Sequence, residues 1–486
     1  MSIRDATRKQ PAQTGRSPVR AKEQETARKE SKMAQVKFPF DTFETETAEQ
    51  LREKMAEAGI DVPVSPDLSP LTRQFYIEGR TIANSMAIQP LEGLDALENG
   101  APGKLTFARY EKLAAQGAGM LWIEATAFSE DGRDSVRQLM LNEETLNEFR
   151  HLAQRIDRAA RVAGHRPPYK ILQLTHSGRC SRDRNGRPAP LAAFENPYLD
   201  RLMGPAKIVT DDYLDAMMYQ LTDAAVLAYE AGFEAIDLKL CHQYLMKELL
   251  CAYKREGKYG GSQENRFRFA VETVGHIQAR LGSSLGIAVR LNAYDGIPWP
   301  YGWGMKQQEG VFETDLTEVK ELMRQLHRKG VQIFNISTTS PRFSPCGNGY
   351  LDNFVDDVQT DPFRGVADLL HATKELRQSL PRDICFVGTG LSWFGPFSAN
   401  IGAGCIEHGW FDTAGFGRSV MTDNDFIPSV LEGKQPDRKK ACRGCDSCFR
   451  LFYADLPTGC PVYHKAWEDL YRAASEKGLI SGSVIY

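Results

Sequence analysis

Eight short apolar runs, each followed by a stretch of helix length, constrain the fold of this chain most. Near-continuous apolar strands that alternate with helices indicate a parallel sheet, and eight such units predict an α/β fold, the closed (β/α)8 TIM barrel. An open doubly wound sheet is the alternative, but it usually has a Gly-rich dinucleotide-binding turn after its first strand, which is missing here. The runs cover residues 86–88, 120–123, 171–174, 235–238, 287–290, 331–334, 384–387 and 412–416, and helical patterns between them include 213–231, 266–281 and 316–329.

The 486 residues exceed a typical barrel, so extensions are expected at both ends. Residues 1–32 contain nine Lys or Arg, four Asp or Glu and no aromatic residue, which predicts a disordered basic tail and makes Met33 a candidate start. We expect an N-terminal extension over 33–67 with a helix over 45–58, the barrel over 68–435 and a separate C-terminal segment over 436–486.

Charge and hydropathy exclude several classes of protein. The net charge of −3 gives no electrostatic reason to expect binding to nucleic acid or a membrane surface. No apolar run reaches the ~20 residues that a membrane-spanning helix requires. Ten cysteines without an apolar signal sequence indicate a reducing, cytoplasmic location.

Four cysteines near the C-terminus form the most specific motif. They read Cys442-x-x-Cys445-x-x-Cys448, followed after eleven residues by Cys460-Pro461. Three closely spaced thiolates with a distant fourth before proline are typical of a cubane iron–sulfur (4Fe-4S) cluster. A structural zinc site is the alternative, although it usually uses two separated pairs of ligands.

Polar residues and glycines stand where the predicted strands end, which is the functional face of a barrel. Gln173 ends the third run and Arg290 the fifth. The last two strands lead into glycine turns, where barrels commonly bind a phosphate, although glycine also merely permits a tight turn. These turns contain Gly388, Gly390, Gly417 and Arg418.

The fourth run leads into Lys239, His242 and Tyr244. Lysine and histidine can donate hydrogen bonds to an oxygen that gains negative charge, and tyrosine can deliver a proton to a carbon at neutral pH. Three such groups after one strand predict a catalytic site at this point.

The order of these motifs resembles the old yellow enzyme family of flavin oxidoreductases. Within it, the cysteine set is similar to the iron–sulfur branch that includes 2,4-dienoyl-CoA reductase and trimethylamine dehydrogenase. The resemblance runs from about Leu68 to the cysteines. The matching stretches are residues 79–86, 173–179, 242–245, 259–266 and 417–418.

The resemblance implies non-covalent FMN at the barrel mouth. Gln173 would meet the pyrimidine edge, Arg290 would lie near N1 and O2, and Ala87 to Pro90 would pack beside the ring system. Gly388, Gly390, Gly417 and Arg418 would hold the phosphate. His242 would bind the activating oxygen of a substrate and Tyr244 would protonate its α-carbon, after hydride transfer from the reduced flavin to the β-carbon.

The sequence departs from these relatives at several points. Many family members carry His in place of Lys239, so the lysine either favours a carboxylate or thioester substrate or pairs with Asp237 or another acid. Trimethylamine dehydrogenase holds its flavin covalently through a cysteine in the loop after the first strand, but the loop over 89–93 has no cysteine. Dienoyl-CoA reductase has a catalytic histidine after its sixth strand, but the loop over 337–342 has no histidine.

The chain ends 26 residues after Cys460, so we expect no second nucleotide-binding domain. Electrons would then come through the cluster from a ferredoxin, a flavodoxin or a flavoprotein subunit. Direct reduction by NADH or NADPH is the alternative. Phe449, Phe452 and Tyr453 would either form part of a docking surface or pack the cluster against the barrel.

The sequence thus predicts an ene reductase that acts on an activated C=C bond. One alternative is an oxidative demethylase or amine dehydrogenase, with Trp122, Trp299 and Trp303 in an aromatic bowl. The other is an electron-transfer subunit, against which His242 and Tyr244 argue. The substrate loops over 291–310 and 337–357 carry no motif that identifies a substrate, and the sequence does not distinguish a monomer from a homo-oligomer.

Overall fold

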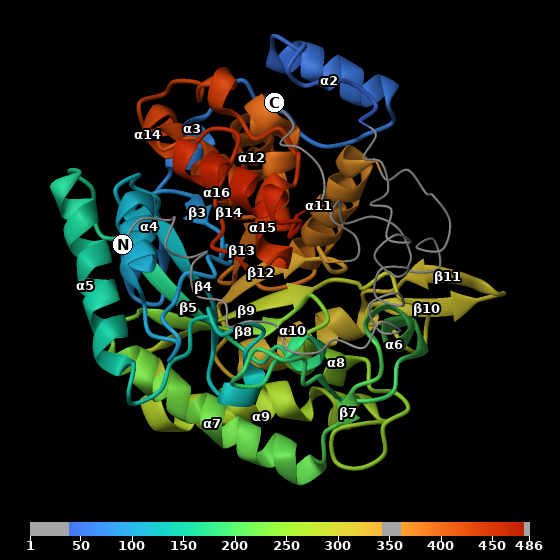
Figure 1. Cartoon of the computed structure of the whole chain (residues 1–486). Helices are drawn as coiled ribbons and strands as arrows, with labels where there is room; N and C mark the ends of the chain where they lie inside the picture. The colour runs from blue at the N-terminus through green and yellow to red at the C-terminus, as the bar shows by residue number, and fades with distance from the viewer. Residues whose placement is uncertain (1–37, 343–360, 481–486) are drawn as a thin grey trace.

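A computed structural model describes residues 38–342 and 361–480. Its centre is a closed barrel of eight parallel strands, which confirms the predicted TIM barrel (Figure 1). Each strand contains most of one predicted apolar run, although the sixth begins two residues later than expected. In chain order the strands are β3 (Met86–Ile88), β4 (Met120–Ala127), β5 (Tyr169–Thr175), β8 (Ala235–Leu240), β9 (Gly286–Asn292), β12 (Ile333–Ser337), β13 (Cys385–Gly388) and β14 (Thr413–Phe416).

Helices surround the barrel and bury their apolar faces against it. Side-chain caps fix where several begin: Thr210, Ser262 and Asp361 each accept a hydrogen bond from a backbone N–H of the first turn that would otherwise lack a partner. The surrounding helices are α4 (Lys104–Ala114), α5 (Leu146–Val162), α7 (Asp211–Glu230), α9 (Gln263–Leu281), α10 (Thr317–Arg328), α11 (Pro362–Gln378) and α12 (Ser398–Glu407).

The barrel is closed at the end where its strands begin. The hairpin of β1 (Phe75–Ile77) and β2 (Arg80–Ile82) forms the floor, because Ile77 and Ile82 pack with Met120 and Ile171 in the barrel interior. A second, larger core lies between the strands and the surrounding helices. The functional groups are therefore expected at the opposite end, where the strands end.

Shorter elements are inserted between these units or precede them. The predicted helix over 45–58 is α2 (Ala48–Glu57), which Thr47 caps. The others are α3 (Ser69–Thr72), β6 (Leu191–Ala192), α6 (Pro197–Met203), β7 (Lys207–Ile208), α8 (Leu245–Leu250), β10 (Met305–Gln308), β11 (Val311–Thr314), α13 (Arg418–Thr422) and α14 (Phe426–Leu431).

The C-terminal segment contains α15 (Ser447–Tyr453) and α16 (Lys465–Glu476) and packs beside the barrel mouth (Figure 1). Two contacts fix it there. The backbone N of Thr458 donates to the carbonyl of Gly93 at 2.8 Å, and Ser135 Oγ donates to Asp455 Oδ1 at 2.5 Å. These contacts join the segment to the loops after β3 and β4.

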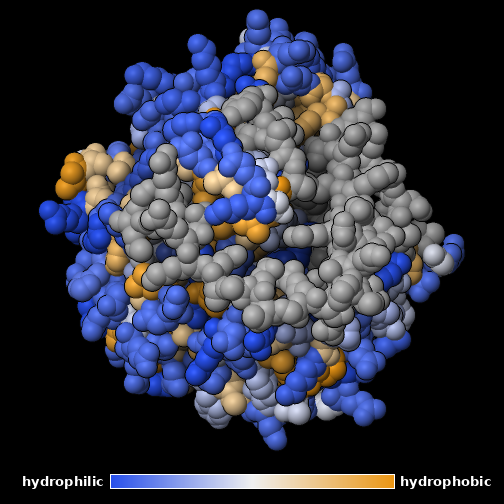
Figure 2. All heavy atoms as spheres, in the orientation of Figure 1, coloured by the Kyte–Doolittle hydropathy of each residue, from blue (hydrophilic) through white to orange (hydrophobic). Residues whose placement is uncertain are grey.

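The visible surface is mostly hydrophilic, with scattered apolar patches (Figure 2). Within residues 38–342 and 361–480, no helix combines the length and the apolar character that crossing a bilayer requires. The predicted basic tail over 1–32 and the Met33 start lie outside the described residues, as do residues 343–357 of the predicted substrate loop.

Candidate active site

Asp237 on β8 is the centre of a buried polar layer at the barrel mouth. Its Oδ2 accepts from Gln173 Nε2 at 2.7 Å and Trp122 Nε1 at 3.1 Å, and its Oδ1 accepts from the backbone N of Arg290 at 2.6 Å. Because an ionised carboxylate only accepts, Gln173 turns its amide nitrogen to Asp237 and keeps its carbonyl oxygen for another partner. Burial raises the pKa of Asp237 to about 6, against the lowering effect of Gln173 and Arg290.

Polar atoms in this layer remain unused. Gln89 Nε2, Asn335 Oδ1 and Arg290 Nε are buried without a hydrogen-bond partner among the described residues. Asn335 Nδ2 donates to Gln89 Oε1 at 2.8 Å. This hydrogen bond occupies the nitrogen of the Asn335 amide and the oxygen of the Gln89 amide. Unpaired buried polar groups are costly. The layer therefore fits a ligand whose edge carries donors and acceptors, as the predicted placement of a flavin pyrimidine ring requires.

The two predicted phosphate turns lie side by side. Gly388 of β13 pairs with Ala414 of β14, and the backbone N of Ser419 donates to Ser392 Oγ at 3.1 Å. Gly390 has φ 85°, a left-handed conformation that glycine adopts without strain. At Gly388, a Cβ would overlap the ring of Phe411, so packing alone requires this glycine.

Arg418, the predicted phosphate ligand, contacts the C-terminal segment. Its Nη1 lies 2.7 Å from Asp446 Oδ1, and its guanidinium lies 4.2 Å from the centroid of the Trp393 ring. Asp446 directly follows Cys445, so this pair joins the turn after β14 to the loop that carries the cysteines.

Lys239 is the register partner of Arg290 on the neighbouring strand. Its Nζ lies 3.1 Å from Glu92 Oε1 and 4.0 Å from the centroid of the Tyr244 ring. Of the two expectations for Lys239, the structure therefore agrees with the pairing to an acid. This acid is Glu92, from the loop after β3, and not Asp237. Burial raises the pKa of Glu92 to about 7, against the lowering effect of Lys239.

The turn after β8 has an unusual backbone. His242 has φ 60° and Gln243 has φ 66°, so two successive residues with a Cβ adopt the left-handed conformation, which costs about 1–2 kcal/mol for each. His242 is partly buried, and a ring nitrogen, Nε2, lies 2.8 Å from Ser337 Oγ. Burial, with the charges of Arg290 and Lys239, holds the pKa of His242 well below its ordinary value, so the imidazole is neutral at pH 7.

Tyr244 directly precedes α8, without a capping hydrogen bond from its side chain, and is 8% exposed. Burial holds the pKa of Tyr244 well above its ordinary value, and the charges of Asp134 and Cys180 act in the same direction. The phenol therefore keeps its proton through neutral pH, as a proton donor requires.

Asp134, Cys180 and Arg342, from the loops after β4, β5 and β12, all act electrostatically on Tyr244. Backbone hydrogen bonds of 2.8 Å, from Ser177 N to the carbonyl of Gly132 and from Arg182 N to that of Arg133, join the first two loops. Asp134 is 8% exposed, and neither of its carboxylate oxygens has a hydrogen-bond partner within the described part of the chain.

Arg342 follows β12 and reaches the C-terminal segment. Its guanidinium lies 5.4 Å from the ring centroid of Tyr453 and 5.8 Å from that of Phe452. Tyr453 is 45% exposed, whereas Phe452 is partly buried. The aromatic group on α15 thus packs against the barrel loop and also reaches the surface.

Several groups at the mouth were not predicted from the sequence. Asn335 follows the interior residue Ile333 by two positions, so the period of two in a strand could have identified it. Gln89 lies in the stretch over 87–90 that was predicted to flank the ring, and only its hydrogen bond to Asn335 was not predicted. Glu92, Asp134 and Arg342 lie in loops, and no periodic pattern indicates where a loop side chain points.

The predicted aromatic bowl is wrong. Trp122 is buried in the barrel interior, Trp303 is fully buried in the outer core against Phe267, and Trp299 is 43% exposed beside Tyr253. The three rings therefore do not line one site.

Of the four predicted cluster ligands, Cys442 and Cys445 precede α15, Cys448 lies in its first turn and Cys460 follows it. Cys442 and Cys460 are buried, and Cys445 and Cys448 are partly buried. Burial raises the pKa of Cys460 to about 11, and the nearby Cys442 and Cys445 contribute to this shift. Among the described residues, no group of three or more His, Cys, Asp or Glu side chains is arranged around a single metal ion.

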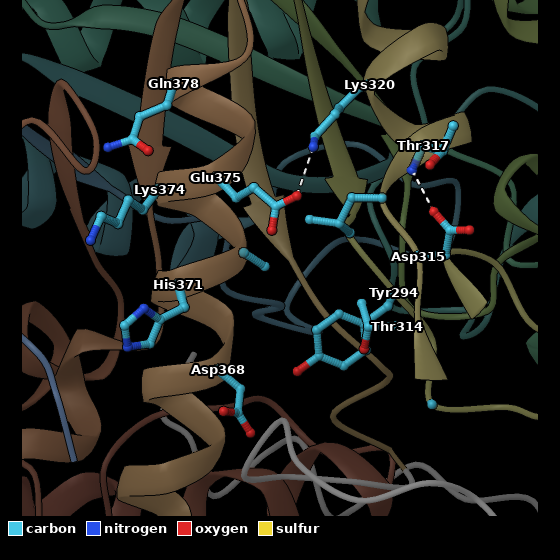
Figure 3. A pocket seen from close by; sticks show the side chains of 13 residues that line it. Tyr294, Thr314, Asp315, Thr317, Lys320, Asp368, His371, Lys374, Glu375 and Gln378 are labelled. Atoms are coloured by element: carbon cyan, nitrogen blue, oxygen red, sulfur yellow. Dashed lines mark hydrogen bonds and ion pairs between the residues drawn. The ribbon is translucent and has the colours of Figure 1, made fainter. Parts of the chain in front are cut away.

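A cavity of about 780 Å³ lies outside the barrel wall between α10 and α11 (Figure 3). Lys320 Nζ lies 2.6 Å from Glu375 Oε1 across it, and Tyr294, Asp315 and His371 also line it. Tyr294 and Gly296 belong to the predicted substrate loop over 291–310, whereas none of the predicted catalytic, cofactor-binding or cysteine residues lines this cavity.

Curated relatives align with the chain in part. The NADPH dehydrogenase of Bacillus velezensis is 29% identical over 220 residues, which are 44% of this chain and 61% of the relative. That of a Geobacillus species is 28% identical over 315 residues, which are 62% of this chain and 89% of the relative. The chain thus spans less than two thirds of the Bacillus protein.

Solved structures share the fold at low identity. A 2-naphthoyl-CoA reductase complex has a TM-score of 0.67 at 19% identity, over 83% of this chain and 58% of that one. Histamine dehydrogenase from Rhizobium sp. 4-9 has a TM-score of 0.61 at 18% identity, over 83% and 53%. An old yellow enzyme homologue from Zymomonas mobilis has a TM-score of 0.55 at 18% identity, over 74% and 92%.

These comparisons confirm the resemblance that the motifs predicted. A family model also matches residues 71–349, more than half of the chain. The chain therefore belongs to the NADH:flavin oxidoreductase / NADH oxidase family of oxidoreductases.

Proposed function

We propose that this protein is an FMN-dependent ene reductase, which reduces an activated C=C bond conjugated to a carbonyl, acid or thioester. The observation that carries the proposal is the arrangement of His242, Tyr244 and Lys239 beside the polar layer of Asp237. An electron carrier without a substrate needs neither a buried phenol that holds its proton nor a neutral imidazole next to it.

The polar layer supplies the groups that bind the flavin ring. Gln173 offers a carbonyl oxygen, because Asp237 holds its nitrogen, and Arg290 offers a cation and an unpaired Nε–H. Bound FMN would supply the hydride. A cation at this position stabilises the negative charge of a reduced flavin. Gly388, Gly390, Gly417 and Arg418 are proposed to bind the phosphate, and Ala87 and Pro90 to flank the ring.

Each substrate-facing residue has one role in the proposal. The neutral imidazole of His242 donates a hydrogen bond to the substrate oxygen, and the phenol of Tyr244 gives its proton to the α-carbon. Lys239 is already paired with Glu92, so it acts on the site through its charge and through its position on the Tyr244 ring.

Anaerobic mixing experiments test this function. The protein is reduced with dithionite, excess reductant is removed, and 2-cyclohexen-1-one is added as a simple activated alkene. We expect the oxidised flavin spectrum to return and one cyclohexanone to form for each flavin. If ferricyanide reoxidises the flavin but the enone does not, the proposal is wrong.

We also propose that Cys442, Cys445, Cys448 and Cys460 bind a 4Fe-4S cluster that receives electrons from an external donor. The spacing of the cysteines supports this proposal, since three closely spaced thiolates with a distant fourth before proline are typical of such a cluster.

The donor would be a ferredoxin, a flavodoxin or a flavoprotein subunit, and NAD(P)H is the alternative. Stopped-flow mixing of the pure protein with NADPH distinguishes them. Fast flavin reduction without a partner protein would refute the external donor.

Amine oxidation is a second candidate, because both carboxylate oxygens of Asp134 are buried without a hydrogen-bond partner among the described residues and could bind an ammonium group. Anaerobic mixing of the oxidised protein with trimethylamine or histamine tests it. Flavin reduction by the amine would favour this candidate over the ene reductase.

A further inference from the structure

The turn that presents His242 and Tyr244 needs support from outside itself. His242 and Gln243 are both left-handed, with φ 60° and 66°, and Tyr244 then returns to an extended conformation at the start of α8. Residues with a Cβ persist in this conformation only when surrounding contacts hold them. Relaxation of the turn would move both side chains that face the substrate.

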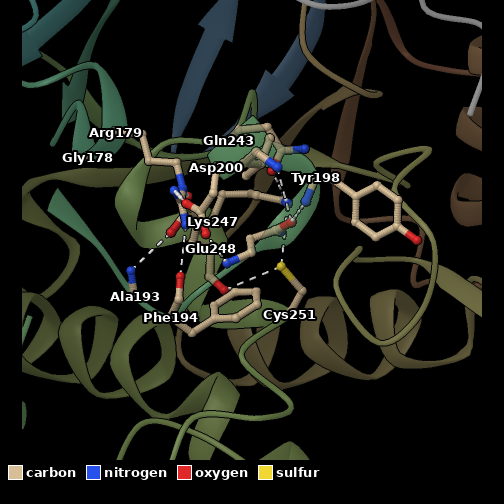
Figure 4. A network of polar contacts seen from close by, with 12 residues as sticks. Gly178, Arg179, Ala193, Phe194, Tyr198, Asp200, Gln243, Lys247, Glu248 and Cys251 are labelled. Carbon is tan, nitrogen blue, oxygen red and sulfur yellow. Dashed lines mark hydrogen bonds and ion pairs between the residues drawn. The ribbon is translucent and has the colours of Figure 1, made fainter. Parts of the chain in front are cut away.

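A buried ion pair, Lys247–Asp295, contacts this turn through Gln243, and Figure 4 shows Lys247 beside Gln243. Lys247 is fully buried, and its Nζ donates to Gln243 Oε1 at 2.6 Å and contacts a carboxylate oxygen of Asp295. Asp295 lies in the loop after β9, where Asn292 Nδ2 at 3.0 Å and the backbone N of Trp303 at 2.8 Å donate to it. The side chain of Gln243 is therefore tied, through Lys247, to a different strand.

Glu248, the residue after Lys247, fixes helix α8 on another side. Glu248 Oε1 accepts from Arg179 Nε at 2.6 Å, and Glu248 Oε2 accepts from the backbone N of Ala193 at 3.0 Å (Figure 4). The backbone N of Leu245 donates to the carbonyl of His176 at 3.2 Å. The short helix α8 is thus fixed between the loops after β5 and β9.

Stability alone does not account for the Lys247–Asp295 pair. Burying two charges has a large desolvation cost, and apolar residues of similar size often replace such a pair without loss of stability. What apolar residues would not replace is the hydrogen bond from the ammonium group to Gln243, one of the two left-handed residues.

We propose that Lys247, held by Asp295, is a positioning residue that keeps the 242–244 backbone in the conformation that directs His242 and Tyr244 to the substrate. The inference rests on the proposed function, in which His242 and Tyr244 act on an alkene substrate. Lys247 acts through Gln243 and is not itself proposed to contact the substrate.

The test compares two matched double variants of the holoprotein. Lys247→Met with Asp295→Asn removes the pair and leaves an acceptor for the backbone N of Trp303. The control, Lys170→Met with Asp157→Asn, removes the ammonium group of another buried lysine, which lies 2.5 Å from Asp157 and 3.1 Å from Glu234 at the start of β5.

Reoxidation of the reduced protein is then followed with two oxidants. With 2-cyclohexen-1-one we expect the first variant to be at least about tenfold slower than wild type, because a small displacement of reacting groups has large kinetic effects. With ferricyanide, which needs no proton donor, it should stay within about twofold of wild type, and the control should match wild type with both oxidants. Equal losses with both oxidants, or no loss with the enone, would overturn the inference.

Hydrogen exchange gives a readout that needs no substrate. Peptides that cover 241–250 should exchange faster in the first variant than in wild type, and at the wild-type rate in the control. Wild-type exchange rates in both variants would overturn the inference. If the wild-type protein does not reduce the enone, the proposed function fails while this exchange result still stands. If the first variant does not fold, Gln243→Ala, which keeps the ion pair, must show the same faster exchange.

Discussion

Replacement of Asp237 by asparagine should remove a pH dependence of stability that this one buried group produces. The folded-state pKa of Asp237 is about 6, whereas its ordinary value is 3.8. Each unit of pKa difference corresponds to ~1.36 kcal/mol, so the contribution of this group to the free energy of unfolding changes by about 3 kcal/mol over this pH range. The native state holds this proton more tightly than the unfolded chain. Wild-type stability from this group is therefore fully present below pH 4 and is lost as the pH rises towards 6.

The asparagine side chain does not titrate, so the Asp237→Asn variant should gain up to about 3 kcal/mol relative to wild type between pH 4 and pH 7. The assay is urea unfolding followed by circular dichroism at several pH values, in cofactor-free protein because ligand binding shifts apparent stability. All other titrating groups cancel in the comparison. A difference between the two proteins that stays constant within about 0.5 kcal/mol over this range would refute the reasoning.

Four further substitutions test other parts of the site. Tyr244→Phe should slow reoxidation by 2-cyclohexen-1-one by about 100-fold or more in stopped-flow mixing, and an unchanged rate would remove its role as proton donor. His242→Ala should mainly raise the enone concentration needed for half-maximal rate, whereas a loss in kcat alone would contradict a binding role. Cys448→Ala should lower the iron content measured by elemental analysis, and full retention of iron would exclude this residue as a ligand. Gly390→Ala, at φ 85°, should lower the free energy of unfolding by about 1–2 kcal/mol in urea, and no change would contradict a strained turn.

The fold could be predicted because its pattern is local. A short apolar run indicates each barrel strand, and the apolar pattern located the helices over 213–231 and 266–281, although α7 and α9 begin two and three residues earlier, after the caps Thr210 and Ser262. Register then brings Lys239 beside Arg290 and Gln173 beside Asp237 without further information.

The remainder of the site depends on contacts between distant segments. Glu92 reaches Lys239 across 147 residues of sequence, and Lys247 reaches Asp295 across 48, so neither pairing has a local signal. Gln243 could not be recognised as left-handed, because the conformation is imposed by Lys247 and not favoured by glutamine itself. The tryptophan bowl failed for the same reason, since Trp299 and Trp303 lie in the loop after β9 and no local pattern shows where loop side chains point.

The central claim is that one chain holds FMN at the barrel mouth and a cluster in the segment packed beside it. Quantitation of flavin, iron and acid-labile sulfide in anaerobically purified protein tests it most directly. The account predicts one releasable FMN and about four irons with matching sulfide for each chain. Zinc in place of iron, or a protein without flavin, would contradict it.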